Sequence, residues 1–255
     1  MTMLAASLAL VAVLGIAVRA SAPSPANTVI LHGHPQRLHL YGPTTGRPVI
    51  VASGDGGWVH LAPHLAEQLA ARGWFVTGFD ARAYLSSGTS GGGTLAVRDV
   101  QRDFGMLIEL VSESARKPLL VGVSEGAGLS VLAAADPRVR DRISGVVTFG
   151  LGDVNELGWR WRDSIIYLTK GIPNEPVFHA ADFISQVSPA PLALVWSTHD
   201  EFVSHRDQER LATLARAPTR VWTVQASDHR FSDNVALLDM NLMDVVDWIS
   251  RLRDQ

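Results

Sequence analysis

Residues 122–126, with the sequence GVSEG, contain the side chain best suited to chemistry in this chain. They form a G-x-S-x-G motif, preceded by the apolar run PLLVGV and followed by small residues. In that context the serine sits on a tight turn from strand to helix, where a side chain at either glycine would collide with its neighbours. The hydroxyl then projects from the edge of a sheet, and the helix N-terminus favours negative charge beside it. The motif therefore predicts that Ser124 is a nucleophile; the alternative is an ordinary glycine-rich turn.

A serine hydroxyl needs a base, and the base needs a carboxylate that orients it. Asp200 and His229 follow Ser124 in the order Ser, Asp, His that accompanies this type of turn. Asp200 comes just after the apolar run LALVW, and His229 stands between the last strand pattern and the last helix pattern. Because the carboxyl ends of parallel strands share one edge of a sheet, we expect the three side chains to lie together. Asp153, which follows an earlier strand pattern, is the alternative acid.

Attack on a carbonyl carbon creates an oxyanion, and two backbone amides are expected to stabilise it. One is the N–H of Glu125, directly after the nucleophile, and the other is the N–H of Asp55 in the glycine-rich loop SGDGGW. Their carboxylates would disfavour the developing negative charge unless they point outward, toward a cationic group of the substrate. We therefore predict an ester with a cationic head, and the segment Trp159–Trp161 as an apolar or cation–π surface over it. The alternative is that both carboxylates only face solvent.

The histidines do not predict a metal site. His60 and His64 are four residues apart, but no HExxH motif is present and Pro63 lies between them. No third ligand accompanies them, and no GK[ST] sequence follows the glycine-rich loop. The expected reaction uses neither a metal nor another cofactor.

Alternating strand and helix patterns must position these residues. Apolar strand patterns are expected at 28–31, 37–41, 48–52, 74–79, 118–123, 143–149, 192–196 and 219–224. Helix patterns are expected at 61–72, 97–111, 129–135, 204–214 and 238–252. This alternation predicts the α/β class, with a mostly parallel central sheet and helices on both faces. Residues 152–191 break the alternation, and we interpret them as a small cap inserted over the carboxyl edge of the sheet. An irregular loop is the alternative.

The composition suits one globular domain, which we assign to residues 27–255. The chain has 255 residues, of which 47% are hydrophobic and 18% are charged, and its formal net charge is −3. It has no basic run, so a nucleic-acid partner is not expected. It has no cysteine, which excludes disulfides and thiol catalysis.

Residues 1–26 are interpreted as a leader. Met3–Val18 is an almost unbroken apolar stretch. It is shorter than the roughly 20 residues of a membrane span and suits the core of a signal peptide. Ala20-Ser21-Ala22 then supplies a small-x-small cleavage pattern. A cleaved signal peptide and a retained N-terminal anchor both fit, and both predict a domain in the periplasm or at the outer face of the inner membrane, close to a membrane surface.

The SGDGGW loop after a buried strand, the downstream GVSEGA elbow and the late histidine together resemble the VirJ/AcvB family of bacterial periplasmic proteins. The resemblance extends from about Pro48 to the C-terminus. It implies an α/β-hydrolase fold and hydrolysis of aminoacylated phosphatidylglycerol in the periplasm. Matched motif by motif, it implies that Ser124, Asp200 and His229 form the catalytic triad.

Two classes of function follow from these patterns. The first is a serine hydrolase that cleaves a small-molecule or lipid carboxylic ester through an acyl-enzyme. The second is a catalytically silent module of the same fold that binds a protein partner. The ordered Ser, Asp and His at strand ends favour the enzyme, because a scaffold has no need of them. An intracellular thioesterase or peptidase is a third hypothesis, which the leader disfavours.

Overall fold

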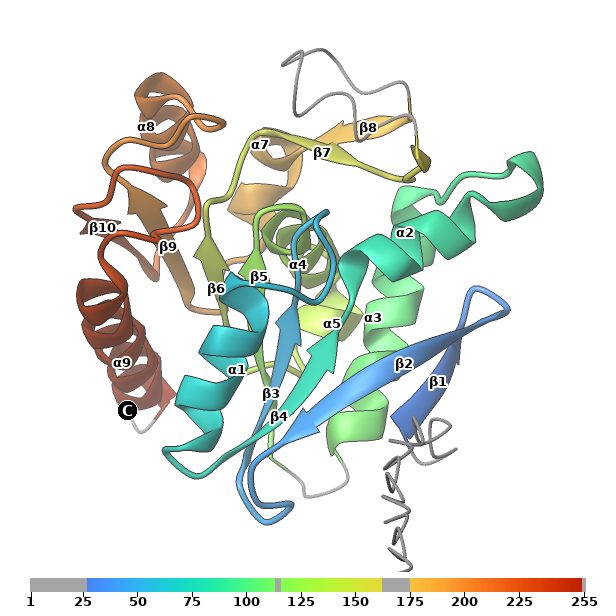
Figure 1. Cartoon of the computed structure of the whole chain (residues 1–255), viewed down its shortest axis with the longest axis horizontal. Coiled ribbons are helices and arrows are strands. Elements are labelled where there is room, and N and C mark those ends of the chain that lie inside the picture. The colour runs from blue at the N-terminus through green and yellow to red at the C-terminus, as the bar shows by residue number, and fades with distance from the viewer. Residues whose placement is uncertain (1–26, 113–115, 162–174, 254–255) are drawn as a thin grey trace, which may run out of the picture.

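The computed structural model describes residues 27–112, 116–161 and 175–253. Its centre is an eight-stranded sheet in the order β1-β2-β4-β3-β5-β6-β9-β10 (Figure 1). The strands are β1 (Thr28–Leu31), β2 (His34–Tyr41), β3 (Arg47–Ala52), β4 (Trp74–Phe79), β5 (Leu119–Val123), β6 (Gly145–Phe149), β9 (Leu192–Ser197) and β10 (Thr219–Val224). The pairs β1–β2 and β2–β4 are antiparallel, and the pairs from β4 to β10 are all parallel. The mostly parallel sheet expected from the sequence is therefore confirmed.

Helices cover both faces of this sheet (Figure 1). On one face, α1 (Leu61–Ala70) and α9 (Val235–Arg253) bury a shared apolar core. The other face is covered by α2 (Ala81–Gly88), α3 (Val97–Val111), α4 (Glu125–Ala134), α5 (Pro137–Arg140) and α8 (His205–Leu214). Because the strands from β4 to β10 run in one direction, their carboxyl ends lie along one edge of the sheet, where a site can form.

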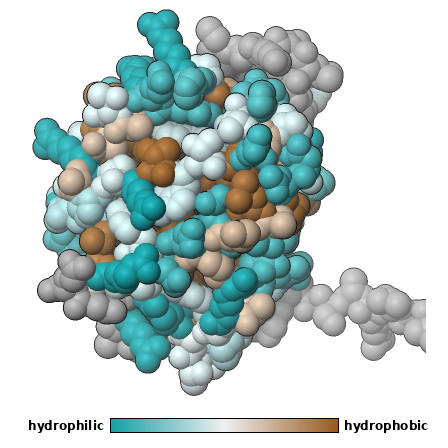
Figure 2. Space-filling view, turned by 90° about the vertical axis from the view of Figure 1, so that its left-hand side faces the viewer, coloured by the Kyte–Doolittle hydropathy of each residue, from teal (hydrophilic) through white to brown (hydrophobic). Residues whose placement is uncertain are grey.

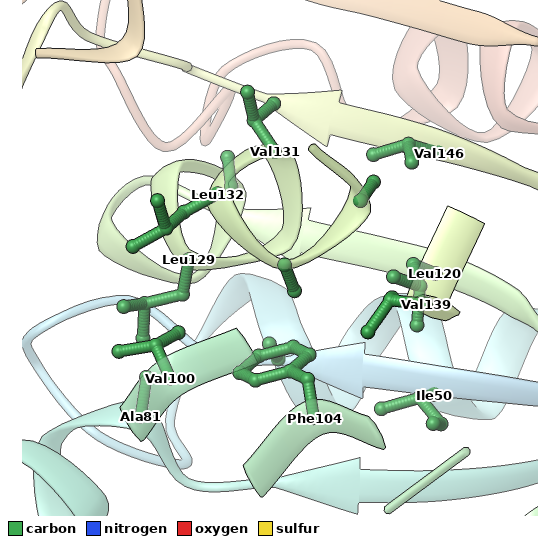
Figure 3. Close-up of a cluster of buried hydrophobic side chains, with 14 of the residues drawn as sticks. Ile50, Ala81, Val100, Phe104, Leu120, Leu129, Val131, Leu132, Val139 and Val146 are labelled. Atoms are coloured by element: carbon green, nitrogen blue, oxygen red, sulfur yellow. The ribbon is translucent and has the colours of Figure 1, made fainter. Parts of the chain in front are cut away.

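The core between α3, α4 and the sheet explains the apolar patterns from which these helices were expected. Val100 and Phe104 of α3 are fully buried, and Figure 3 shows them in one cluster with Leu129 of α4 and with Ile50 and Leu120 of the sheet. Burying a side chain of this size stabilises a fold by about 1.5–3 kcal/mol. Helix α4 packs against both α3 and the sheet, and this packing fixes the turn between β5 and α4.

Helix α2 was not expected from the sequence. Its residues ARAYLSSG offer few apolar side chains, so the helical repeat is weak. Asp80 starts the helix instead, because its Oδ1 accepts a hydrogen bond from the N–H of Ala83 at 2.9 Å. Helix α4 also begins earlier than expected, directly after Ser124, because the glycine-rich first turn hides its apolar pattern.

The described parts of residues 152–191 form a hairpin and a short helix. β7 (Val154–Glu156) and β8 (Val177–His179) pair antiparallel as a separate two-stranded sheet, followed by α7 (Ala180–Phe183). We call β7 and β8 the cap hairpin. It lies above the edge where the parallel strands end (Figure 1). Residues 162–174 and the leader, residues 1–26, lie outside the described residues.

The side of the molecule that carries α8, β10 and α9 exposes hydrophobic residues in small groups between hydrophilic ones (Figure 2). Exposed hydrophobic side chains of these elements include Val221 of β10 and Met240 of α9. Within the described residues, no helix combines the length and apolar character that crossing a membrane requires.

Candidate active site

Ser124 lies on the turn between β5 and α4, in a strained conformation with φ of 49°. Positive φ is rare for residues other than glycine and tends to occur at functional sites. A Cβ at Gly122 would overlap Gly126 and Ala127 of the helix, and a Cβ at Gly126 would overlap the backbone of Ala52 and Ser53. The two glycines therefore allow the turn to be this tight, as the motif predicts.

His229 and Asp200 form a hydrogen-bonded pair. His229 Nδ1 lies 2.7 Å from Asp200 Oδ2, and the Asp200 side chain is fully buried. Asp200 Oδ1 accepts hydrogen bonds from the backbone N–H groups of Phe202 and Val203, at 2.9 and 2.8 Å. The backbone N–H of His229 donates to Glu201 Oε2 at 2.7 Å. These contacts fix both residues and leave the imidazole Nε2 as the nitrogen not engaged by the carboxylate.

The imidazole also packs against Gly150, which follows β6. A Cβ at Gly150 would lie 3.0 Å from His229 Nδ1 and 3.1 Å from Nε2, and closer still to Cε1. Gly150 has a φ of 66°, which side chains disfavour. On another side of the ring, Phe202 meets it edge-on at 5.4 Å between ring centroids. The absence of a side chain at position 150 makes room for the base.

Asp153, the alternative acid, lies in a different environment. Its Oδ1 accepts from the N–H of Ala181 at 2.9 Å, and its Oδ2 contacts His179 at 3.0 Å and Arg210 at 3.1 Å. Burial opposes ionisation of this carboxyl, but these hydrogen bonds and charges outweigh it and lower the pKa of Asp153. Asp153 therefore ties the cap hairpin to α7 and α8, and the carboxylate in contact with the His229 imidazole is that of Asp200.

The SGDGGW loop approaches the nucleophile closely. A Cβ at Gly54 would lie 3.3 Å from Ser124 Cβ. Trp58 holds the end of the loop: its ring stacks on His39 at 4.7 Å, and its Nε1 donates to the Tyr41 hydroxyl at 3.1 Å. Asp80 also fixes the loop, because its Oδ2 accepts from the N–H of Trp58 at 3.2 Å.

Two backbone amides near Ser124 donate no hydrogen bond to any described residue. Among the described residues, neither the N–H of Asp55 nor the N–H of Glu125 donates a hydrogen bond. Glu125 is the first residue of α4, where the helix leaves its N–H groups without intrahelical partners. Both amides are therefore available to a negatively charged oxygen.

A cavity of about 500 Å³ brings these parts together. Ser124 and His229 both line it, and so do Asp55, Val59 and Phe202. Such a volume suits a small ligand or one end of a larger one. Of the residues expected at the site, Ser124, His229 and Asp55 thus line one open space, whereas Asp200 and Glu125 do not line it.

The expected orientation of the Glu125 carboxyl is wrong. Its side chain points into the protein, with the residue only 9% exposed, and Oε1 accepts from the backbone N–H of Glu156 at 2.7 Å. Burial, and then the nearby charges of Glu156 and Asp55, raise the pKa of Glu125 well above its usual range. A buried carboxyl held near its neutral form cannot attract a cationic substrate. The acidic residues that line the cavity are Asp55 and Glu201.

The expected tryptophan surface is also not formed by Trp159. The guanidinium of Arg82 covers its ring at 4.1 Å from the centroid, so the cation–π partner is internal. Trp161 is 70% exposed and does not line the cavity. Among the described residues, no cluster of three His, Cys, Asp or Glu side chains has a geometry that would hold a metal ion.

Three contributors were missed at the level of sequence: Asp80, which holds the glycine-rich loop, Glu201, which accepts from the backbone of the base, and Gly150, which makes room for it. The signal for Asp80 was an acidic residue directly after a buried strand. Gly150 stood in the same position after β6. In a parallel sheet, a polar residue or a glycine directly after a strand lies at the edge where sites form, so its position in the sequence indicates a role at the site.

Comparison with known proteins places this geometry in context. A sequence family described as bacterial virulence protein (VirJ) matches residues 47–248. No curated protein matches the chain. Among solved structures, the esterase domain of a Rhodothermus marinus protein is similar with a TM-score of 0.60 and 20% identity, covering 88% of this chain and 96% of its own.

Two further structures show the same similarity. Est1E from Butyrivibrio proteoclasticus has a TM-score of 0.65 and 14% identity, over 88% of this chain and 98% of its own. A membrane phospholipase A described as a bacterial virulence factor has a TM-score of 0.65 and 12% identity, over 88% of this chain and 87% of its own. At these identities the similarity shows the fold, which is that of the α/β-hydrolases.

Proposed function

The chain belongs to the bacterial virulence protein (VirJ) family, and we propose that it is a serine hydrolase that cleaves a carboxylic ester through an acyl-enzyme. The single observation that supports this most is the 2.7 Å contact between His229 and the buried Asp200, at the cavity that the strained Ser124 also lines. A carboxylate, an imidazole and a hydroxyl in this order are the parts of a catalytic triad.

In the proposed reaction, Ser124 Oγ attacks the carbonyl carbon of the ester while His229 Nε2 takes the hydroxyl proton. Asp200 holds the proton on Nδ1, so that Nε2 is the basic nitrogen, and stabilises the imidazolium that forms. His229 then protonates the leaving alcohol, and an acyl-Ser124 remains. Water, deprotonated by His229, hydrolyses the acyl-enzyme and releases the acid.

The oxyanion of each tetrahedral intermediate would be bound by the N–H groups of Asp55 and Glu125. Both amides lack another acceptor among the described residues, and the loop that carries Asp55 is held in place before substrate arrives. One such donor typically contributes about 3 kcal/mol to transition-state stabilisation. A preorganised pair of donors explains why the SGDGGW loop needs glycine where it approaches Ser124.

For the substrate, we propose an ester with a cationic acyl group, such as aminoacyl-phosphatidylglycerol. Asp55 supports this, because this acidic residue lines the cavity that Ser124 also lines. The leader pattern of residues 1–26 supports an enzyme located outside the inner membrane, where such a lipid is accessible. Hydrolysis of lysyl-phosphatidylglycerol should be faster than that of a phospholipid with only fatty acyl esters, and Asp55→Asn should reduce this preference while keeping its backbone N–H. Equal rates for the two lipids would leave a general esterase.

A fluorophosphonate probe tests the reaction class, because it labels only an activated serine. The wild type should take up the label, and folded Ser124→Ala should not. Ser90→Ala is a matched control, since Ser90 is exposed and hydrogen-bonds to the backbone of Ser87. Labelling of Ser124→Ala would show that the nucleophile is wrong. A wild type that is folded yet takes up no label would favour the silent module that binds a protein partner.

A further inference from the structure

A second cavity, of about 450 Å³, adjoins the one that contains Ser124. The two cavities share three lining residues, His60, Leu61 and Arg230. The second cavity continues between the start of α1 and the start of α9, where its other lining residues are His64, Ser232, Val235 and Leu238. The two cavities therefore lie side by side, with Arg230 at the boundary that they share.

Arg230 is a charged side chain common to both cavities and follows the proposed base directly in the chain. Its side chain is exposed, and its guanidinium forms no ion pair or side-chain hydrogen bond among the described residues. A guanidinium has five N–H donors in a planar fork, which matches the oxygens of a phosphate or carboxylate. The positive charge of Arg230 is thus available to a ligand.

The acidic groups around this second cavity already have partners. Asp239 Oδ1 lies 2.7 Å from His64 Nε2. Asp228 accepts hydrogen bonds from the backbone N–H and the hydroxyl of Ser232. The positive charge of Arg230 also acts on the Asp228 carboxylate. Among the described residues the two side chains form no ion pair, so the N–H donors of the Arg230 guanidinium remain for a ligand.

The position of Arg230 also indicates which part of the ester would reach it. In serine hydrolysis the base returns its proton to the leaving alcohol, so the alcohol departs on the side of His229. Arg230 is adjacent to His229 and lines the space beyond it. We infer that the second cavity is a subsite for an anionic group, a phosphate or a group of similar charge, carried by the alcohol part of the ester, with Arg230 as its specificity-determining residue. This inference rests on the proposed function.

Two acetyl esters test the subsite: 2-acetoxyethyl phosphate and its uncharged counterpart, 2-methoxyethyl acetate. Acid release at constant pH gives kcat/KM for each. The wild type should prefer the phosphate ester by about tenfold, the effect of one charge-assisted contact, and Arg230→Gln should bring the ratio of the two values close to one. Arg251→Gln is the matched control, because this exposed arginine lies about 24 Å from Val235 along α9; it should keep the wild-type ratio.

A third ester tests the assignment to the alcohol side. The 2-methoxyethyl monoester of succinic acid carries its charge on the acyl part. Its kcat/KM relative to that of 2-methoxyethyl acetate should be the same in the wild type and in Arg230→Gln. A preference for this ester that Arg230→Gln abolishes would overturn the assignment. Equal kcat/KM for the two acetyl esters, or a ratio that Arg230→Gln does not change, would overturn the subsite and leave the ester hydrolase intact. Hydrolysis of neither acetyl ester also overturns the inference, and the fluorophosphonate label then decides separately whether the proposed function holds.

The anionic group can belong to a lipid headgroup or to a soluble phosphate ester. To distinguish these two sources, the 2-acetoxyethyl phosphate group is attached through its phosphate to a dialkyl lipid anchor and presented in phosphatidylcholine vesicles. A higher kcat/KM in vesicles assigns the subsite to a lipid surface, and a higher value for the soluble ester assigns it to a soluble metabolite. Both results support the subsite, provided that each depends on Arg230.

Discussion

The carboxyl of Glu125 accepts a hydrogen bond from the backbone N–H of Glu156, and this 2.7 Å contact joins the nucleophile turn to the cap hairpin. Asn155 packs into the same junction, since a Cβ at Gly128 of α4 would overlap its side chain. The residue after the nucleophile therefore has two roles in the proposed enzyme. Its N–H faces the oxyanion, and its side chain anchors the segment above the sheet.

This contact predicts a pH-dependent stability. Burial is the first cause that raises the pKa of Glu125 above its usual value of 4.5, so the folded state favours the neutral form. Its contribution to stability is then fully present below pH 4.5 and is lost as the pH rises toward the raised pKa. Glu125→Gln, which stays neutral, should therefore gain in Tm relative to the wild type as the pH rises from 5 to 8. Thermal melts across this range measure the difference.

The matched control for this experiment is Glu67→Gln, which changes an exposed carboxyl on α1. Its Tm should follow the wild type at every pH. A constant difference between Glu125→Gln and the wild type across the range would show that Glu125 titrates as an ordinary carboxyl.

The two candidate acids should respond differently to neutralisation. Asp200→Asn should reduce kcat on an ester by about 10⁴-fold, because the amide stabilises the wrong imidazole tautomer. Asp153→Asn should retain most of the activity, because Asp153 contacts His179, Arg210 and the start of α7 rather than His229. Steady-state kinetics of both variants decide between them, and the opposite ranking would assign the acid to Asp153.

Two glycine-to-alanine changes in neighbouring helices should have opposite effects on stability. Gly128→Ala would push against Asn155, whose amide holds the backbone of the cap, so the free energy of unfolding should fall by about 1–3 kcal/mol. Gly105→Ala on α3 has room, with Val139 at 3.9 Å as its nearest neighbour, and should raise that free energy by about 0.5–1 kcal/mol. Urea unfolding measures both. Equal effects of the two changes would contradict the tight junction.

Trp58 should matter for the chemical step although it lies outside the cavity lining. Trp58→Ala removes the stack on His39 and the hydrogen bond to Tyr41, so the loop that carries Asp55 loses its anchor. We expect kcat to fall more than KM rises, by up to the roughly 10²- to 10³-fold attributed to one oxyanion donor. Trp58→Phe keeps the ring stack and loses only the hydrogen bond, so its kcat should fall much less. A selective rise in KM would instead indicate a role in substrate binding.

The order of elements and the residues at strand ends were predictable because they follow from local patterns. Buried parallel strands are continuous apolar runs, and the G-x-S-x-G turn carries its own steric requirement. Side-chain direction was not predictable in the same way. Glu125 was expected to face outward, but residues far apart in the chain, Glu156 among them, supply its environment. Trp159 failed for the same reason, since Arg82 from α2, a helix with a weak pattern, covers its ring.

Gly150 offers a diagnostic for related sequences. A side chain at this position would occupy the space of the His229 imidazole, and the positive φ adds a second penalty. A relative with a bulky residue there must displace its histidine, even if its sequence retains all three residues of the triad. Under the proposed function, such relatives should be pseudoenzymes. This one position could therefore sort hydrolases from inactive homologues in genome data before any protein is purified.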